Sequence, residues 1–186
     1  MTVEDQLHGL VERLTGALGD ELISVVLYGS AARGEHHEKH SDLNVLCILR
    51  RVGIAELERL AGPLRWWLRL NPTPPLFLSE EEIRTSCDAF PIEFLDIRAA
   101  YQVLYGKDLV ASIEVATANH RRQLEHELRS RLLRLRRRFL ETQRDDKALA
   151  RLMLEALPTF STLFRHALLA AGVDAPLRGG HISSCR

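Results

Sequence analysis

Two short apolar runs, separated by a polar stretch, constrain the fold of this chain more than any other feature. The runs are Glu21–Tyr28 (ELISVVLY) and Leu43–Leu49 (LNVLCIL). Apolar runs of this length, bounded by turn residues, predict buried strands. Between them, Gly29-Ser30 is typical of a turn, Ala31–Gly34 fits one helical turn, and Glu35–His40 is typical of a polar loop. The sequence therefore predicts two neighbouring strands joined by a turn and a loop.

Helices and further strands are expected around this pair, because apolar residues recur at helical spacing on both sides of it. The first predicted helix covers Asp5–Leu18 and stops at Gly19, and the second covers Ile54–Leu70 and is broken or kinked at Gly62-Pro63. A third, short helix begins at the capping box Ser79-x-x-Glu82 and ends near Cys87. A third short strand is predicted at Leu76–Leu78, and a fourth strand at Pro91–Ile97. The first part of the chain is therefore predicted to be α/β.

The pattern changes after about residue 110. Apolar residues step by four, four, three and four along one long amphipathic helix, at Leu124, Leu128, Leu132, Leu135 and Phe139. Two more helical faces follow, the first ended or bent at Pro158 and the second stopped at Gly172. We expect an α/β domain over residues 1–110 and a helical domain over residues 111–186, with a frayed or truncated end at Leu177–Arg186.

The cysteine content and the absence of long apolar runs bear on the compartment. The chain has three widely spaced cysteines, an odd number that argues against a disulfide framework and favours a reducing compartment. The N-terminus carries acids where a signal peptide needs basic residues, and no run reaches the roughly 20 apolar residues of a membrane span. We expect a cytoplasmic protein without a membrane partner.

Phosphate-binding chemistry is suggested where the first strand ends. At Gly29 a glycine lets the backbone approach a ligand closely, Ser30 adds a hydroxyl donor, and Arg33 adds a positive charge. At the second strand, Asp42 and Asn44 are two residues apart and therefore project to one face. Their oxygens could hold Mg²⁺, which prefers oxygen ligands and often shares them with phosphates. Taken alone, each pattern is also typical of an ordinary turn or a solvated strand start.

Two further acids stand between apolar neighbours in Pro91–Ile97, at Glu93 and Asp96. An acid in an apolar strand is costly to bury without a partner or an ion. On a strand, residues three apart face opposite sides, so at most one of these two acids is expected to join Asp42.

Together, these residues resemble the nucleotidyltransferase superfamily of the DNA polymerase β type. The run LYGSAARGEHHEKHSDLNVL looks like the hallmark of that superfamily, which is Gly-Ser, a variable loop, and Ser-Asp-x-Asp. The resemblance covers roughly residues 22–108. The helical remainder is similar, with weaker specificity, to the C-terminal bundles of aminoglycoside-type and stand-alone bacterial nucleotidyltransferases.

The resemblance implies a polymerase β-like domain with a mixed sheet, followed by a helical bundle, and transfer of a nucleoside monophosphate from an NTP, with ATP expected, to a hydroxyl or phosphate. It implies nucleotide binding by Gly29, Ser30, Arg33 and Asn44, and binding of Mg²⁺ by Asp42, Asn44 and Glu93. Asp42 and Glu93, or Asp96 in place of Glu93, would be catalytic.

The sequence departs from the hallmark at Asn44, where the superfamily has a second acid. An amide keeps one oxygen ligand but removes a negative charge, which weakens magnesium binding. Two functions therefore stay open: slow nucleotidyl transfer, or a nucleotide-binding or antitoxin-like module that associates with a partner protein or with itself. A third, weaker interpretation is an aminoglycoside-modifying enzyme.

The segment from Arg121 to Arg144 holds nine arginines and three glutamates. Such a face could contact the phosphates of a nucleic acid, line a cleft, or be a solvated helix surface with local ion pairs. Over residues 121–138 no aromatic residues interleave with the arginines for base stacking, so a solvated face is favoured and a nucleic-acid partner is not expected.

Overall fold

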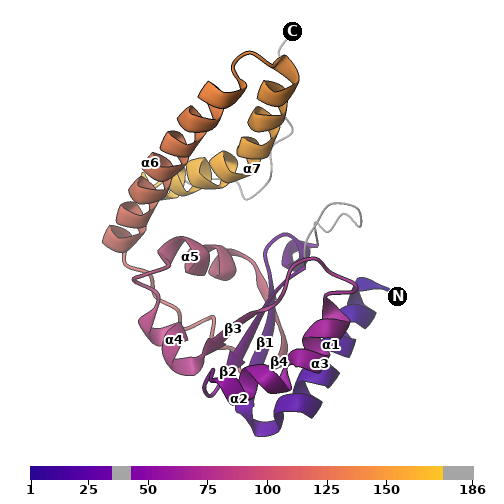
Figure 1. Ribbon diagram of the computed structural model, residues 1–186. Coiled ribbons are helices and arrows are strands. Elements are labelled where there is room, and N and C mark those ends of the chain that lie inside the picture. Colours follow the sequence, from indigo (N-terminus) through magenta and orange to yellow (C-terminus); the bar gives the residue numbers. More distant parts are fainter. Residues whose placement is uncertain (35–42, 174–186) are drawn as a thin grey trace. The chain divides into compact units, whose positions relative to one another are not determined.

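The computed structural model describes residues 1–34 and 43–173 (Figure 1). The chain divides into two compact units, Met1–Val115 and Ala116–Arg186. In the described part of the chain, no helix is both long enough and apolar enough to cross a membrane.

A mixed four-stranded sheet forms the centre of the first unit. Its strands are β1 (Leu22–Tyr28), β2 (Asn44–Leu49), β3 (Leu76–Ser79) and β4 (Tyr101–Gly106), in the order β3-β2-β1-β4. The central strand β1 is antiparallel to both β2 and β4, whereas β3 runs parallel to β2. The predicted strands at residues 21–28, 43–49 and 76–78 are therefore confirmed, as is the mixed α/β fold.

Helices cover both faces of this sheet (Figure 1). One face packs on α1 (Val3–Leu18), α2 (Ile54–Arg59) and α3 (Ala61–Trp67), with Leu10, Leu14 and Trp67 fully buried. The other face packs on α4 (Glu80–Thr85) and α5 (Pro91–Ala99), through Ile83, Phe94 and Ile97. Side chains alternate along a strand, so β1 sends Val25 to the first core and Val26 to the second.

The helix boundaries follow from local chemistry. Thr2 and Asp5 form a capping box at the start of α1, and Gly19 ends this helix with a φ of 56° before a 3₁₀ turn over Gly19–Glu21. The Ser79 and Glu82 capping box opens α4, with the Ser79 N–H donating to Glu82 Oε2 at 2.7 Å. The long helix expected over residues 54–70 divides at Leu60, so a break is found, three residues before Pro63.

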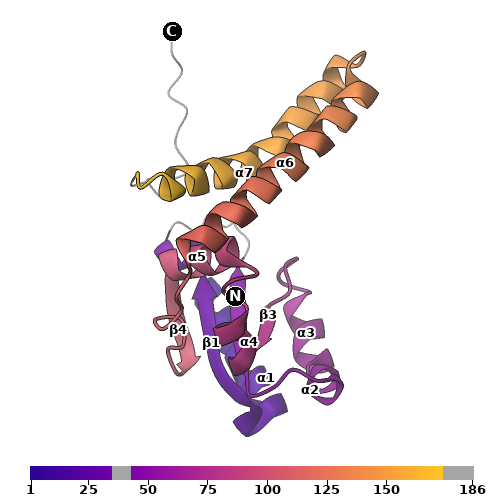
Figure 2. The ribbon, with the colours of Figure 1, turned by 90° about the vertical axis from the view of Figure 1, so that its left-hand side faces the viewer.

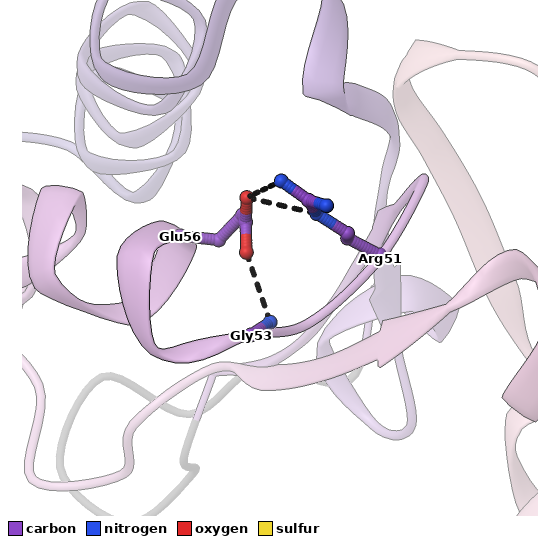
Figure 3. A network of polar contacts seen from close by, with 3 residues as sticks. All are labelled: Arg51, Gly53 and Glu56. Carbon is purple, nitrogen blue, oxygen red and sulfur yellow. Dashed lines mark hydrogen bonds and ion pairs between the residues drawn. The ribbon is translucent and has the colours of Figure 1, made fainter.

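Glu56 is a buried carboxylate that fixes the start of α2 (Figure 3). Its Oε2 accepts from the Gly53 N–H at 3.0 Å, and its Oε1 accepts from Arg51 Nε and Nη2, each at 3.2 Å. Burial raises the pKa of Glu56. The hydrogen bonds from its own backbone N–H, from Arg51 and from Gly53 lower this pKa by more, so the net shift is downward.

The fourth strand predicted at Pro91–Ile97 is wrong, because this segment is the helix α5. Pro91 stands in the first turn, where the missing N–H costs no hydrogen bond. Pro91, Phe94 and Ile97, which are three residues apart and share one helix face, are buried together with Ile92. The fourth strand is β4, directly after this helix.

The second unit is a pair of helices that lie side by side, α6 (Thr117–Thr142) and α7 (Asp146–Ala170) (Figure 2). Asp145 caps α7 by accepting from the N–H groups of Lys147 and Ala148. The end or bend predicted at Pro158 is a bend, because one helix continues through it and changes direction along its length (Figure 2).

Polar contacts tie α6 to α7. His120 Nε2 and His166 Nδ1 lie 3.0 Å apart in a buried hydrogen bond, and Arg138 Nη2 bonds Glu155 Oε2 at 2.7 Å. Few apolar side chains in the described part of this unit are buried: Leu124 on α6, and Leu152 and Leu163 on α7.

Candidate functional site

The turn after β1 is built on a glycine conformation that other residues rarely adopt. Gly29 has a φ of 82°, and its N–H donates to the Ala100 carbonyl at 2.9 Å. A short 3₁₀ turn over Ala31–Arg33 follows, with Ser30 at its N-cap. The Ser30 hydroxyl does not cap this turn, and Gly34 closes it in the left-handed region. The Gly-Ser turn and the single helical turn predicted from the sequence are both present.

Asn44 begins β2 directly beside this turn. A Cβ atom added to Gly29 would lie 3.2 Å from Asn44 Nδ2, so the amide of Asn44 lies over the glycine backbone. In the sheet, Asn44 pairs with Tyr28, the residue before Gly29. The two parts of the sequence motif that the structure describes therefore meet at one end of β1.

The sequence pattern does not single out Tyr28, yet this residue lies at the end of the central strand β1, directly before Gly29. It is paired with Asn44 of β2 on one side and with Tyr101 of β4 on the other. Directly opposed residues point to the same face, which is the face covered by α5. The available sequence signal was its position immediately before Gly29.

The helical conformation of α5 changes the expected relationship between its two acids. On a helix, residues three apart share one face, so Glu93 and Asp96 lie on the same side instead of opposite sides. Burial raises the pKa of the Tyr28 phenol, and the negative charges of Asp96 and Glu93 raise it further. Both carboxylates are therefore close enough to this edge of the sheet for their charges to act on Tyr28.

The predicted residues differ in how far the structure describes them. Gly29, Ser30, Arg33 and Asn44 come together around the end of β1, with Glu93 and Asp96 on α5. Asp42 lies outside the described residues.

The predicted metal ligands among the described residues are hard oxygen donors, namely the Asn44 amide and the carboxylates of Glu93 and Asp96. Oxygen donors of this kind suit Mg²⁺ and not a softer ion. Within the two described ranges there is no cluster of three or more histidines, cysteines or acids that could hold a metal ion by itself.

Comparison with known proteins gives one sequence family and two solved structures. Residues 11–101 match the family described as Nucleotidyltransferase domain. No curated protein matches the sequence significantly. The structure is similar to that of spectinomycin adenyltransferase AAD(9) from Enterococcus faecialis with ATP and spectinomycin, at 13% identity over 76% of each chain and a TM-score of 0.52.

A toxin–antitoxin structure with AMP-PNP is also similar, at 15% identity, a TM-score of 0.39, and coverage of 67% of this chain and 93% of that chain. At 13% identity, the likeness to the adenyltransferase shows a shared fold.

Proposed function

Because residues 11–101 match the nucleotidyltransferase domain family, we propose that the chain binds a magnesium–nucleoside triphosphate at the end of β1. The observation that carries this proposal is the contact between Gly29, which has a positive φ, and the Asn44 amide. This contact lies beside Tyr28, on which the charges of the α5 carboxylates act. ATP is the proposed nucleotide, since the similar adenyltransferase was solved with ATP.

Each residue has a proposed part in nucleotide binding. The backbone at Gly29 can approach a phosphate closely because no side chain stands in the way. The Ser30 hydroxyl, which does not cap the turn, would donate to a phosphate oxygen, and Arg33 would add a positive charge. Asp42, Asn44 and Glu93 would hold Mg²⁺ together with the triphosphate. When bound, magnesium would neutralise phosphate charge and stabilise the attacking and leaving oxygens.

The proposed reaction is transfer of a nucleoside monophosphate to a hydroxyl or phosphate acceptor. Asp42, with Glu93 or Asp96, would draw the proton from an acceptor hydroxyl. Glu93 and Asp96 share one helix face, so both carboxylates stay candidates for this role.

Asn44 favours a second candidate function, which is nucleotide binding without turnover. Replacing the second acid by an amide removes one negative charge from the ligand set of a hard cation. Such a protein would act as a nucleotide sensor or as an antitoxin-like module that associates with a partner protein.

Titration calorimetry with the four NTPs, with and without Mg²⁺, tests the shared premise of both functions. We expect magnesium-dependent binding in the parent, loss of binding in Asp42→Ala, and tighter binding in Asn44→Asp. Asp20→Ala is the matched control, because Asp20 is an exposed acid at the opposite end of β1. Binding that is equal in Asp42→Ala and in the parent would contradict the proposed site.

Pyrophosphate release separates the two functions. Release that is abolished by Asp42→Ala, and increased by Asn44→Asp, supports an enzyme. Binding without release in the parent, with release only in Asn44→Asp, supports a binding module. Labelling of an aminoglycoside panel that includes spectinomycin by radiolabelled ATP tests whether the acceptor belongs to that class.

A further inference from the structure

Helix α7 carries two apolar stripes, and α6 covers only one of them. The first stripe includes Leu152 and Leu163, which are buried. The second consists of Met153, Leu157, Phe160, Phe164 and Leu168, with successive steps of four, three, four and four residues. Such spacing keeps the side chains on one helix face. We call these five residues the outer stripe.

Four of the five residues of the outer stripe are exposed, and Phe160 is half-buried. The exposed fractions are 62% for Met153, 56% for Leu157, 59% for Phe164 and 44% for Leu168. The Phe160 and Phe164 rings contact each other at a centroid distance of 5.9 Å. On α6, Leu132 and Phe139 also remain 42% and 44% exposed. A helix that is apolar on two sides is typical of a helix packed between neighbours.

The apolar area is close to what a stable interface needs. If a fully exposed residue of this size presents about 200 Å², the four exposed α7 residues, together with Leu132 and Phe139 of α6, leave roughly 600 Å² uncovered. A standard protein–protein interface buries about 800 Å² per partner. Polar residues around the stripe would supply the remainder, since interfaces have a polar rim.

The order of residues in the outer stripe indicates what covers it. The stripe has nearly the same spacing from either end, so an antiparallel copy of α7 would place Met153 opposite Leu168 and Leu157 opposite Phe164. Phe160 lies within one residue of the midpoint, and no charged residue belongs to the stripe. A self-complementary patch of this kind is what a two-fold symmetric interface requires.

We propose that the outer stripe is the interface with a second copy of this chain, in which the α6–α7 pairs of two protomers form a four-helix bundle. Two-helix units complete a core in this way in antiparallel bundles. Residues 121–144 carry nine arginines and three glutamates, so the two copies bring like charges toward each other. Salt screens such repulsion, and the dimer should therefore tighten as ionic strength rises.

Sedimentation equilibrium of the full chain at low and high salt tests this proposal. We expect the parent to have twice the monomer mass, with a dimer that dissociates less at high salt. Phe164→Glu would place an unpaired charge in the interface and should raise the dimer Kd about 100-fold or more. Leu140→Glu is the control, because Leu140 is an apolar residue of α6 that is 66% exposed and has no place in the proposed interface.

Circular dichroism of each variant would show whether the helices remain folded. If Phe164→Glu loses helix, Leu157→Glu replaces it in the same comparison. Disulfide trapping gives a second measurement that does not need a charge. Phe160→Cys, in a chain with Cys87 and Cys185 changed to serine, should cross-link two copies, because residue 160 lies next to the symmetry axis.

Three results would overturn the proposal: a parent that is monomeric at all concentrations, a dimer that Phe164→Glu and Leu140→Glu weaken equally, or a dimer that salt dissociates. A monomeric parent that binds an added, oppositely charged protein through α7 would assign the stripe to a different partner.

Discussion

The Asn44 side-chain amide lies against the backbone of Gly29, so that a Cβ atom at residue 29 would stand 3.2 Å from Asn44 Nδ2. Gly29 also has a φ of 82°, a conformation that side chains with a Cβ atom rarely adopt. The backbone conformation therefore favours glycine at this position, and an added Cβ atom would also require the Asn44 amide to shift by a few tenths of an ångström. The contact joins the end of β1 to the start of β2, where the proposed nucleotide site is built.

Gly29→Ala should lower both stability and nucleotide binding. The left-handed conformation costs a residue with a Cβ atom about 1–2 kcal/mol, and the new methyl group would displace the Asn44 amide. We expect this loss in urea denaturation, and loss of magnesium-dependent NTP binding in calorimetry.

Gly16→Ala is the matched control for this substitution. Gly16 is an exposed residue inside α1, with no atom within 4 Å of an added Cβ. Alanine favours a helix interior over glycine by roughly 0.5–1 kcal/mol, so this variant should be slightly more stable and should bind NTP normally. Equal effects of the two substitutions on binding would mean that the Gly29 contact has no special part in the site.

Much of the fold was predictable because strong local signals agree with the tertiary structure. The residue pattern predicted β1, β2, β3 and the capping box at Ser79, and each of these is present. The same pattern was misleading for Pro91–Ile97, since a short apolar run fits a buried strand and a buried helix equally well.

The error over α5 affected the expected site. Two acids three residues apart face opposite sides of a strand but share one face of a helix. The strand prediction therefore allowed at most one of Glu93 and Asp96 to join Asp42 in the site. In the structure, the charges of both acids act on Tyr28. Tyr28 itself could not be found by pattern, because its role depends on pairing across the sheet with Asn44 and Tyr101.

Removing the charge of Asp96 should lower the pKa of Tyr28. Burial is the largest cause of the raised pKa of Tyr28, followed by the charges of Asp96 and then Glu93. In Asp96→Asn the pKa of Tyr28 should therefore fall toward its ordinary value of 10.0 but stay above it, because burial remains.

Ultraviolet absorbance titration measures this shift. The chain has three tyrosines, so the Tyr28 curve is the difference between each protein and the same protein with Tyr28→Phe. Glu93→Gln should give a smaller shift, and Glu114→Gln is the control because Glu114 is not among the charges acting on Tyr28. An unchanged curve in Asp96→Asn would show that this carboxylate does not face the phenol.

Glu56 should make the stability of the first unit depend on acid pH. Folding lowers the pKa of Glu56 below its ordinary value of 4.5, so the unfolded chain binds the proton more readily. The stabilisation is therefore present above about pH 4.5 and is lost as the pH falls through the folded pKa. Glu56→Gln should be less stable than the parent at neutral pH, and this difference should shrink in acid.

Thermal melts across this pH range test the assignment to Glu56. Glu58→Gln is the control, because Glu58 is an exposed acid on the same helix. A difference between Glu56→Gln and the parent that stays constant with pH would indicate lost packing, and not lost charge, as its cause.

Ser24→Ala should stabilise the protein, whereas a second serine-to-alanine change in the same sheet should destabilise it. Ser24 is fully buried in β1, and within the described residues its hydroxyl has no hydrogen-bond partner. A buried polar group without a partner costs about 1–3 kcal/mol, so removing the oxygen should raise the free energy of unfolding by about 1 kcal/mol.

In contrast, the Ser79 hydroxyl accepts from the Glu82 N–H and caps α4, so Ser79→Ala should lower the free energy of unfolding by about 0.5–2 kcal/mol. Urea midpoints at an unchanged m-value would measure both effects, and a loss of stability in Ser24→Ala would show that its hydroxyl does have a partner in solution.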